Sequence, residues 1–240
     1  MNDIVNARRR VAVLGSTGSI GRQALDVLKM HPDRFELVAL GAGSDTQALE
    51  QQARAFPGVR TALGVQGAHE IATADDVDLV LNGIVGAAGL KASVAALQAG
   101  KILALANKES LVAGGRVCLD AAATGGGTIV PVDSEHAALA QCLEGRSPGS
   151  VERVVLTASG GPFRTRDDLS DVTPADALAH PTWEMGPKIT VDCATLFNKG
   201  FEVIEAHFLF GFGYDAIDVV VHPQSVVHAM AQLVDGSFVM

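Results

Sequence analysis

The chain has 240 residues, of which 48% are hydrophobic and 19% are charged, and it contains 26 glycines. This length and composition exclude a disordered or fibrous protein and predict one large and one smaller packed unit. A formal net charge of -9 excludes a wide nucleic-acid surface, because such surfaces concentrate basic residues, and no apolar run is long enough to predict a membrane span.

The first half of the chain alternates short apolar runs with helical periodicity. Residues 11–14 predict a strand that ends at Gly15, and residues 19–30 predict a helix. Later elements of the same kinds are predicted as strands over 35–40, 77–81 and 101–106 and a helix over 87–99. Alternating strands and helices predict a Rossmann-like α/β domain with a doubly wound parallel sheet.

The glycine run 125–127 interrupts this pattern, and a strand predicted over 128–132 leads to Asp133. We therefore place the boundary between a nucleotide-binding domain, residues 1–132, and an α+β catalytic domain, residues 133–240. The second domain is predicted to contain a strand over 151–157, a short helix after Thr173, a helix over 191–210, and antiparallel strands over 217–221, 226–233 and 238–240. Because the sequence stops inside the last apolar run, we expect this domain to be incomplete at its C-terminus.

Three glycines, Gly15, Gly18 and Gly21, lie between the first predicted strand and the first predicted helix. Glycines at this place let the backbone approach a pyrophosphate, and the helix N-terminus offers unpaired N–H groups. A tight turn without a ligand explains the same residues, so both interpretations stay open. Ser44 suits a 2′-phosphate and Asp45 opposes one, so these two residues favour NADP over NAD only slightly.

Two carboxylates, Asp133 and Glu135, lie two residues apart in a loop predicted at a strand end, and a hard divalent cation needs such clustered oxygens. Asn198, Glu202 and Glu205 form a polar stripe on the helix predicted over 191–210. The stripe predicts either a solvent-facing surface or a further carboxylate for the same ion.

The segment from His180 to Lys188 holds the single tryptophan, Trp183, among two prolines and a glycine. It shows no periodicity and predicts a lid over a site, although ordinary packing explains a lone His or Trp equally well.

Seven short motifs occur in a fixed order along the chain and together are specific for one family. In chain order they read GSTGSIG, ANKESLV, PVDSEH, TASGGPF, HPTWEMGPKIT, ATLFNKG and VHPQS. Together they resemble the 1-deoxy-D-xylulose 5-phosphate reductoisomerase family over nearly the whole chain. The resemblance implies conversion of 1-deoxy-D-xylulose 5-phosphate to 2-C-methyl-D-erythritol 4-phosphate in isoprenoid-precursor synthesis, with NADPH and Mg²⁺ or Mn²⁺, in a homodimer.

The resemblance also implies a role for individual residues, with Lys108 and His180 joining the metal ligands as catalytic residues. The implied metal ligands are Asp133, Glu135 and Glu202. The implied dinucleotide contacts are Thr17, Gly18, Ser19, Ile20, Gly43, Ser44, Asp45, Asn107, Glu109 and Gly186. The implied substrate contacts are Lys108, Ser134, Glu135, Ser159, His180, Trp183, Cys193, Asn198, Lys199 and Glu202.

The chain departs from the family pattern at several positions. Cys193 replaces a usual serine and is a weaker donor to a phosphate, while Asp45 and Ala137 replace usual asparagines. The chain is also shorter than family members, so we expect their C-terminal helical domain to be absent.

Two further hypotheses compete with that of an active enzyme. One is a non-catalytic truncated fragment that retains dinucleotide binding, which the short chain favours. The other is a different Rossmann dehydrogenase, which leaves the segments around Trp183 and Lys199 unexplained. Three cysteines without a CxxC pair indicate a reducing compartment, and we expect a cytoplasmic protein whose partner is a small sugar phosphate rather than nucleic acid or membrane.

Overall fold

The computed structural model describes residues 8–240, so the first seven residues of the predicted nucleotide-binding domain lie outside the described part. The chain forms two compact units, Met1–Val132 (unit 1) and Asp133–Met240 (unit 2). Within residues 8–240, no helix is both long enough and apolar enough to cross a lipid bilayer.

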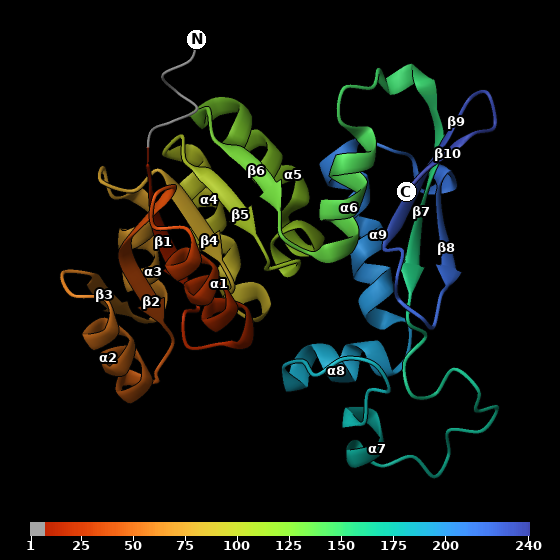
Figure 1. Ribbon diagram of the computed structural model, residues 1–240, viewed down its shortest axis with the longest axis horizontal. Coiled ribbons are helices and arrows are strands. Elements are labelled where there is room, and N and C mark those ends of the chain that lie inside the picture. The colour runs from red at the N-terminus through yellow and green to blue at the C-terminus, as the bar shows by residue number, and fades with distance from the viewer. Residues whose placement is uncertain (1–7) are drawn as a thin grey trace. The chain divides into compact units, whose positions relative to one another are not determined.

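Unit 1 is built on a six-stranded sheet in the order β3-β2-β1-β4-β5-β6, in which every neighbouring pair is parallel (Figure 1). This is the doubly wound order in which the direction of winding reverses between β1 and β4. The predicted Rossmann-like sheet is therefore confirmed. Its strands are β1 (Arg9–Leu14), β2 (Phe35–Ala42), β3 (Arg60–Leu63), β4 (Leu79–Asn82), β5 (Ile102–Leu105) and β6 (Thr128–Pro131).

The helices of unit 1 connect these parallel strands. They are α1 (Ser19–Met30), α2 (Thr46–Ala55), α3 (Gly64–Thr73), α4 (Leu90–Gln98) and α5 (Glu109–Gly125), with a 3-10 turn at Gly86–Gly89. Because parallel crossovers are right-handed, α1 and α2 lie on one face of the sheet, and α3, α4 and α5 pack against one another on the other face. The first strand and helix lie where the hydrophobic pattern predicts them.

Unit 2 contains a four-stranded mixed sheet in the order β10-β9-β7-β8 and four α-helices. The predicted α+β class is confirmed. The strands are β7 (Val151–Ala158), β8 (Ile217–Val221), β9 (Ala229–Leu233) and β10 (Phe238–Val239). The helices are α6 (Ser134–Leu143), α7 (Pro174–Leu178), α8 (Pro187–Ala194) and α9 (Phe197–Phe210).

Three predictions for unit 2 are wrong in detail. The segment after Asp133 is not a loop, because α6 begins at Ser134. The helix predicted over 191–210 is two helices, since the chain leaves helical geometry at Thr195. The strand β8 is parallel to β7 rather than part of an antiparallel run, because the segment 222–228 carries the chain across β7 so that β9 pairs with its other edge.

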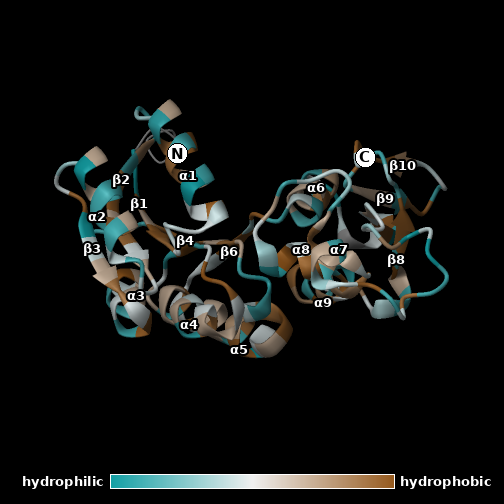
Figure 2. Ribbon diagram, turned by 90° about the horizontal axis from the view of Figure 1, so that it is seen from below, coloured by the Kyte–Doolittle hydropathy of each residue, from teal (hydrophilic) through white to brown (hydrophobic). Residues whose placement is uncertain are grey.

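The core of unit 2 lies between its helices and its sheet. Leu139 of α6, Ala206 of α9, and Val154 and Leu156 of β7 belong to one buried hydrophobic cluster. Figure 2 shows hydrophobic segments around β9 of this unit and along β4 of unit 1, and hydrophilic segments on α1 and α2. Burial of these apolar surfaces stabilises each unit, and in unit 2 it fixes α6 beside α9.

Candidate functional site

In unit 1, the loop between β1 and α1 forms a tight turn at the point where the sheet reverses its winding. Gly18 N–H donates to the Gly15 carbonyl oxygen at 3.0 Å, and Gly18 precedes the first turn of α1. The loop is held from outside by Gln52, which donates to the Ser16 carbonyl oxygen at 2.8 Å. The start of α1 thus presents backbone N–H groups at the place where open α/β sheets bind nucleotide phosphates.

The glycines of this loop are required by close backbone contacts. Gly15 has a φ of +73°, and a Cβ added there would lie 2.6 Å from the Gly83 carbonyl oxygen. A Cβ added at Gly21 would lie 2.3 Å from the Gly15 carbonyl oxygen, so this glycine lets α1 pack directly on the loop. Thr17, Gly18, Ser19 and Ile20 lie between these two contacts, with Ile20 exposed.

The second group of implied dinucleotide contacts follows β2. Gly43, Ser44 and Asp45 are all exposed. The Asp45 side chain caps α2 by accepting a hydrogen bond from Ala48 N–H at 3.0 Å. Its carboxylate is thereby fixed beside Ser44, where a 2′-phosphate would meet a negative charge.

The third group lies between β5 and α5, where Asn107 and Lys108 are buried. The Asn107 amide donates to the carbonyl oxygens of Ile84 and Gly86 at 2.6 and 2.8 Å, and to Glu109 Oε2 at 3.1 Å. Asn107 therefore holds the loop that follows β4 against the start of α5, a structural role beside the implied contact with the dinucleotide. Lys108 and Glu109 follow Asn107 directly in the chain and also make contacts.

In unit 2, the three implied metal ligands come together. Asp133 occupies the N-cap position of α6, Glu135 lies in its first turn, and Glu202 lies on α9. One side-chain oxygen from each lies within 4.8 Å of the other two. Glu202 is only 2% exposed, so the polar stripe on α9 is buried and is not a solvent-facing surface.

Buried polar groups surround Glu202 and balance its charge. Asn198 donates to Glu202 Oε1 at 2.5 Å, and the Lys199 ammonium contacts the other oxygen of the same carboxylate. Lys199 Nζ also lies 3.1 Å from Glu135 Oε1, and Ser134 Oγ donates to Glu135 Oε2 at 2.6 Å. The three metal candidates and three further implied substrate contacts, Ser134, Asn198 and Lys199, therefore form one cluster (the carboxylate cluster).

A divalent cation fits the carboxylate cluster by its chemistry. Three carboxylates from two packed helices offer the hard oxygen ligands that Mg²⁺ and Mn²⁺ prefer. Buried carboxylates need paired cations or a metal, because an isolated buried charge is costly. The residues present in this chain therefore suit the ion that the sequence predicts.

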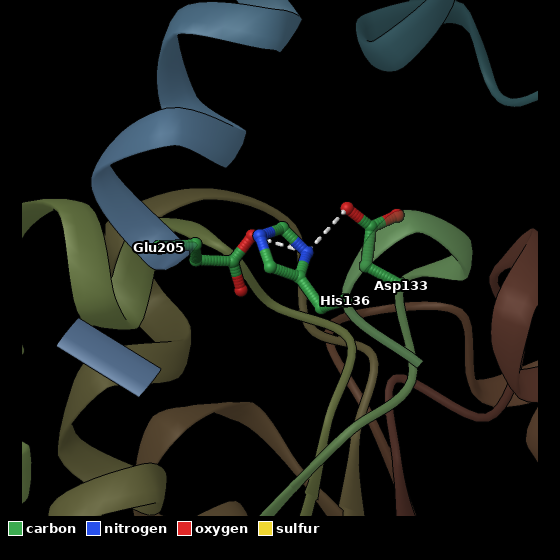
Figure 3. Close-up of side chains that lie close together, drawn as sticks. All are labelled: Asp133, His136 and Glu205. Carbon is green, nitrogen blue, oxygen red and sulfur yellow. Dashed lines mark hydrogen bonds and ion pairs between the residues drawn. The ribbon is translucent and has the colours of Figure 1, made fainter. Parts of the chain in front are cut away.

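Sequence reasoning assigned no role to His136 and included Glu205 only in the polar stripe, and both residues lie next to the carboxylate cluster. Figure 3 shows the His136 ring between the carboxylates of Asp133 and Glu205. Burial lowers the pKa of His136, but the hydrogen bond that its ring donates to Asp133 and the charge of Glu205 outweigh it and raise the pKa to about 9. The signal in the sequence is helical spacing, because His136 follows Asp133 by three residues and Glu205 follows Glu202 by three.

A second group of implied substrate contacts lies between the end of β7 and the segment before α8. His180 Nδ1 accepts hydrogen bonds from Thr182 and Trp183 N–H at 3.2 and 2.9 Å. Its other nitrogen therefore carries the proton and donates to Ser159 Oγ at 3.0 Å. Burial lowers the pKa of His180, as does the positive charge of Arg164, which favours this neutral form.

The predicted lid segment includes Trp183, which is 46% exposed. Its ring lies 6.4 Å from the ring of His228, and His228 Nδ1 lies 3.8 Å from Glu135 Oε1. The single tryptophan thus reaches the carboxylate cluster through one intervening histidine. The predicted lid is not irregular throughout, because Pro187 and Lys188 begin α8.

Cys193 lies near the end of α8 and is partly buried. A Cβ added at Gly161, which has a φ of +67°, would lie 2.1 Å from the Cys193 carbonyl oxygen. The glycine loop after Ser159 therefore packs closely against the end of α8. Gly186, which the resemblance assigns to the dinucleotide, lies in unit 2 directly before α8.

Comparison with family models identifies both halves of the chain. The model described as "1-deoxy-D-xylulose 5-phosphate reductoisomerase" matches residues 11–60 and 57–115, and the model described as "1-deoxy-D-xylulose 5-phosphate reductoisomerase C-terminal domain" matches residues 129–210.

Curated relatives carry the same description. The reductoisomerase of Leifsonia xyli subsp. xyli is 57% identical over 231 residues, which cover 95% of this chain and 63% of the relative. That of Mycobacterium tuberculosis (strain ATCC 25177 / H37Ra) is 53% identical, with 97% and 60% covered. The chain therefore spans less than two thirds of the length of these relatives.

Solved structures agree with these matches. A DOX-P reductoisomerase in complex with NADPH, fosmidomycin and magnesium is 38% identical with a TM-score of 0.91, covering 96% of this chain and 65% of that chain. The Zymomonas mobilis enzyme in complex with NADPH is 40% identical with a TM-score of 0.86, with 97% and 66% covered. A WlbA dehydrogenase from Bordetella pertussis, 13% identical with a TM-score of 0.52, shares the fold alone.

Proposed function

The chain belongs to the 1-deoxy-D-xylulose 5-phosphate reductoisomerase family, and from this premise we propose that it converts 1-deoxy-D-xylulose 5-phosphate to 2-C-methyl-D-erythritol 4-phosphate. The proposed reaction uses NADPH and Mg²⁺ or Mn²⁺ and belongs to isoprenoid-precursor synthesis. The observation that carries the proposal is the convergence of Asp133, Glu135 and Glu202 with Asn198 and Lys199 in one partly buried cluster.

Unit 1 supplies the proposed NADPH site. Gly21 lets α1 pack directly on the loop, and the start of α1 would offer N–H donors to a pyrophosphate. A related structure holds NADPH, which supports the choice of cofactor. The proposed contacts in unit 1 are Thr17, Gly18, Ser19, Ile20, Gly43, Ser44, Asp45, Asn107 and Glu109.

Unit 2 supplies the proposed metal and substrate site. Asp133, Glu135 and Glu202 would hold the ion, and a related structure contains magnesium. When bound, a divalent cation supplies Lewis-acid stabilisation of negative charge on substrate oxygens, and NADPH supplies a hydride. The protein's own contribution is to fix three carboxylates on two packed helices.

Donor groups around this cluster suit a phosphorylated substrate. A phosphate dianion needs neutral donors and a cation, which Ser159, His180, Asn198 and Lys199 of unit 2 would provide. His180 in its neutral form keeps an N–H directed at the Ser159 hydroxyl. Trp183, linked through His228 to Glu135, would cover the bound substrate and exclude water.

We propose in addition that the protein works as a homodimer in the cytoplasm and does not bind nucleic acid. Its family membership supports the dimer. The net charge of -9 opposes contact with a phosphate backbone, and the three cysteines in the sequence suit a reducing compartment.

The test is NADPH oxidation by the purified chain with 1-deoxy-D-xylulose 5-phosphate, with and without Mg²⁺ or Mn²⁺. The matched control is Glu202→Gln, which keeps the side-chain size but removes the charge. We expect metal-dependent turnover that falls by about a thousandfold in the control, since metal-assisted charge stabilisation contributes several kcal/mol.

Two other outcomes would not support the proposed reaction. NADPH binding without turnover would favour a non-catalytic fragment that retains dinucleotide binding. A folded sample that binds no NADPH would refute the cofactor assignment.

A further inference from the structure

One buried histidine contacts both helices that carry the carboxylate cluster. His136 lies on α6, is fully buried, and reaches across to α9. Its Nε2 lies 2.9 Å from the backbone carbonyl oxygen of Glu202. Its Nδ1 lies 3.2 Å from Asp133 Oδ2 and 3.7 Å from Glu205 Oε2 (Figure 3). A single ring therefore contacts two residues of the proposed metal site.

The partners of the ring determine which way its hydrogen bonds run. A backbone carbonyl oxygen only accepts, and an ionised carboxylate only accepts, so both ring nitrogens donate. Asp133, His136 and Glu205 could alternatively be a metal site of their own, since their ligand atoms lie within 4.8 Å of one another. However, a ring that donates from both nitrogens has no lone pair to offer a metal, so we assign this group a different role.

The ring itself is held on two further sides. Glu205 is 2% exposed and lies one turn after Glu202 on α9, so it presents a buried negative charge to the ring. The ring of Phe210, at the end of α9, stacks on His136 at 6.4 Å with an interplanar angle of 11°. These contacts fix the orientation of the imidazole relative to α9.

From this geometry we propose that His136 and Glu205 are positioning residues for the metal site. His136 holds the Asp133 carboxylate and the backbone of Glu202 at a fixed separation, and Glu205 orients the ring. The pair links the start of α6 to α9, so the carboxylates are arranged before an ion binds. This inference depends on the proposed function, because it takes Asp133, Glu135 and Glu202 as the metal ligands.

The test is Mn²⁺ binding to the full chain, measured by electron paramagnetic resonance of free Mn²⁺ without substrate or NADPH. We expect His136→Gln to raise the Mn²⁺ dissociation constant by about tenfold or more, as for other groups that orient metal ligands. Simple charge repulsion predicts the opposite sign, because the substitution removes a cation beside Asp133. Unchanged or tighter Mn²⁺ binding by His136→Gln would overturn the proposal.

A second variant distinguishes the effect of the position of the Glu205 carboxylate from the effect of its charge. Glu205→Asp keeps the negative charge but withdraws the carboxylate from the ring by one methylene, so we expect weaker Mn²⁺ binding here too. Wild-type affinity in Glu205→Asp would contradict the orienting role. This variant also carries the test if circular dichroism shows that His136→Gln does not fold.

Turnover provides a readout that distinguishes positioning from direct catalysis. We expect both variants to recover most of the wild-type kcat at saturating Mn²⁺, whereas a group that acts on the substrate would not recover. A failure of the proposed function looks different: Mn²⁺ binding that Glu202→Gln leaves unchanged would show that the carboxylate cluster is not the metal site.

Discussion

The candidate sites of the two units are formed by different chemical groups, mainly backbone groups in unit 1 and side chains in unit 2. In unit 1, the loop Gly15–Gly21 is one short segment, and the proposed ligand would contact it mainly through backbone N–H groups at the start of α1. In unit 2, the carboxylate cluster takes side chains from α6 and from α9, which are far apart in the sequence. The first site therefore depends on the absence of side-chain atoms, and the second depends on particular side chains and on helix packing.

This difference affects how each site responds to substitution. Atoms added at Gly15 or Gly21 of the loop meet backbone, which cannot move aside. In unit 2, the charged groups are buried and share hydrogen bonds, so removing one leaves its partners unsatisfied.

The largest effect that tests this comparison is expected for Gly21→Ala. The added methyl would meet the Gly15 carbonyl oxygen and the Ser16 Cα, so α1 must move away from the loop. We expect the free energy of unfolding to fall by about 2 kcal/mol and NADPH affinity to fall by about a hundredfold. Calorimetry and NADPH fluorescence titration would measure these changes. The stability control is Gly43→Ala, where no atom lies within 4 Å of the added Cβ; an equal loss of stability there would contradict the packing argument.

The next effect is expected at the nucleotide ribose, where Asp45→Asn removes a charge and keeps the helix cap. Asparagine and aspartate cap helices about equally well, so stability should change little. Removing one charge near a proposed 2′-phosphate should raise NADPH affinity by about fivefold, an effect that salt reduces. Isothermal titration with NADPH and NADH would test this, because NADH has no 2′-phosphate. An equal change for both cofactors would rule out the electrostatic explanation.

A smaller effect is expected for Cys193→Ser, which restores the residue that the family usually has. A hydroxyl is a stronger donor than a thiol, so the KM for the sugar phosphate should fall by about threefold to fivefold. Steady-state kinetics would measure it, with the KM for NADPH as the internal control. An unchanged KM for the sugar phosphate would remove Cys193 from the proposed phosphate contacts.

The smallest effect concerns pH and the segment around Trp183. Because the pKa of His180 is lowered in the folded chain, its contribution to the turn is present above its ordinary value of 6.5 and is lost as the pH falls below it. Protonated Nδ1 no longer accepts the hydrogen bonds from Thr182 and Trp183. We therefore expect the emission of the single tryptophan to change as the pH falls below 6.5.

The histidine that causes this transition can be identified with two variants. His180→Gln should abolish the fluorescence change, whereas His228→Gln, which alters the ring that lies near Trp183, should retain it. A transition that follows His228 instead would show that the turn does not depend on His180.

The ends of individual helices were the part of the fold that could be predicted best from the sequence. The helix α1 begins and ends at the predicted residues, because its apolar spacing, its preceding glycines and its packing all favour the same boundaries. The short helix predicted after Thr173 is likewise confirmed, and Thr173 caps it in a capping box completed by Asp176. The interruption at Thr195 is different, because apolar residues continue across it and periodicity alone does not mark the break.

The direction of β8 and the burial of the charged residues on α9 could not be predicted from the sequence in this way. Alternation indicates that β8 is a strand, but its parallel pairing with β7 depends on where the following segment crosses the sheet. The polar stripe on α9 fits either a solvent-facing surface or a buried site. The packing of α9 against α6 buries it.

The sequence by itself determined the family, the winding of the first sheet, the glycine loop and the three carboxylates, because each depends on short-range pattern or on motifs in order. Only the tertiary structure brought Glu202 to Asp133 and Glu135, buried Lys199 between two carboxylates, and placed His136 and Glu205 behind them. The physical reason is that these contacts join α6 to α9 through a shared hydrophobic core, and a linear pattern does not specify which helices pack together.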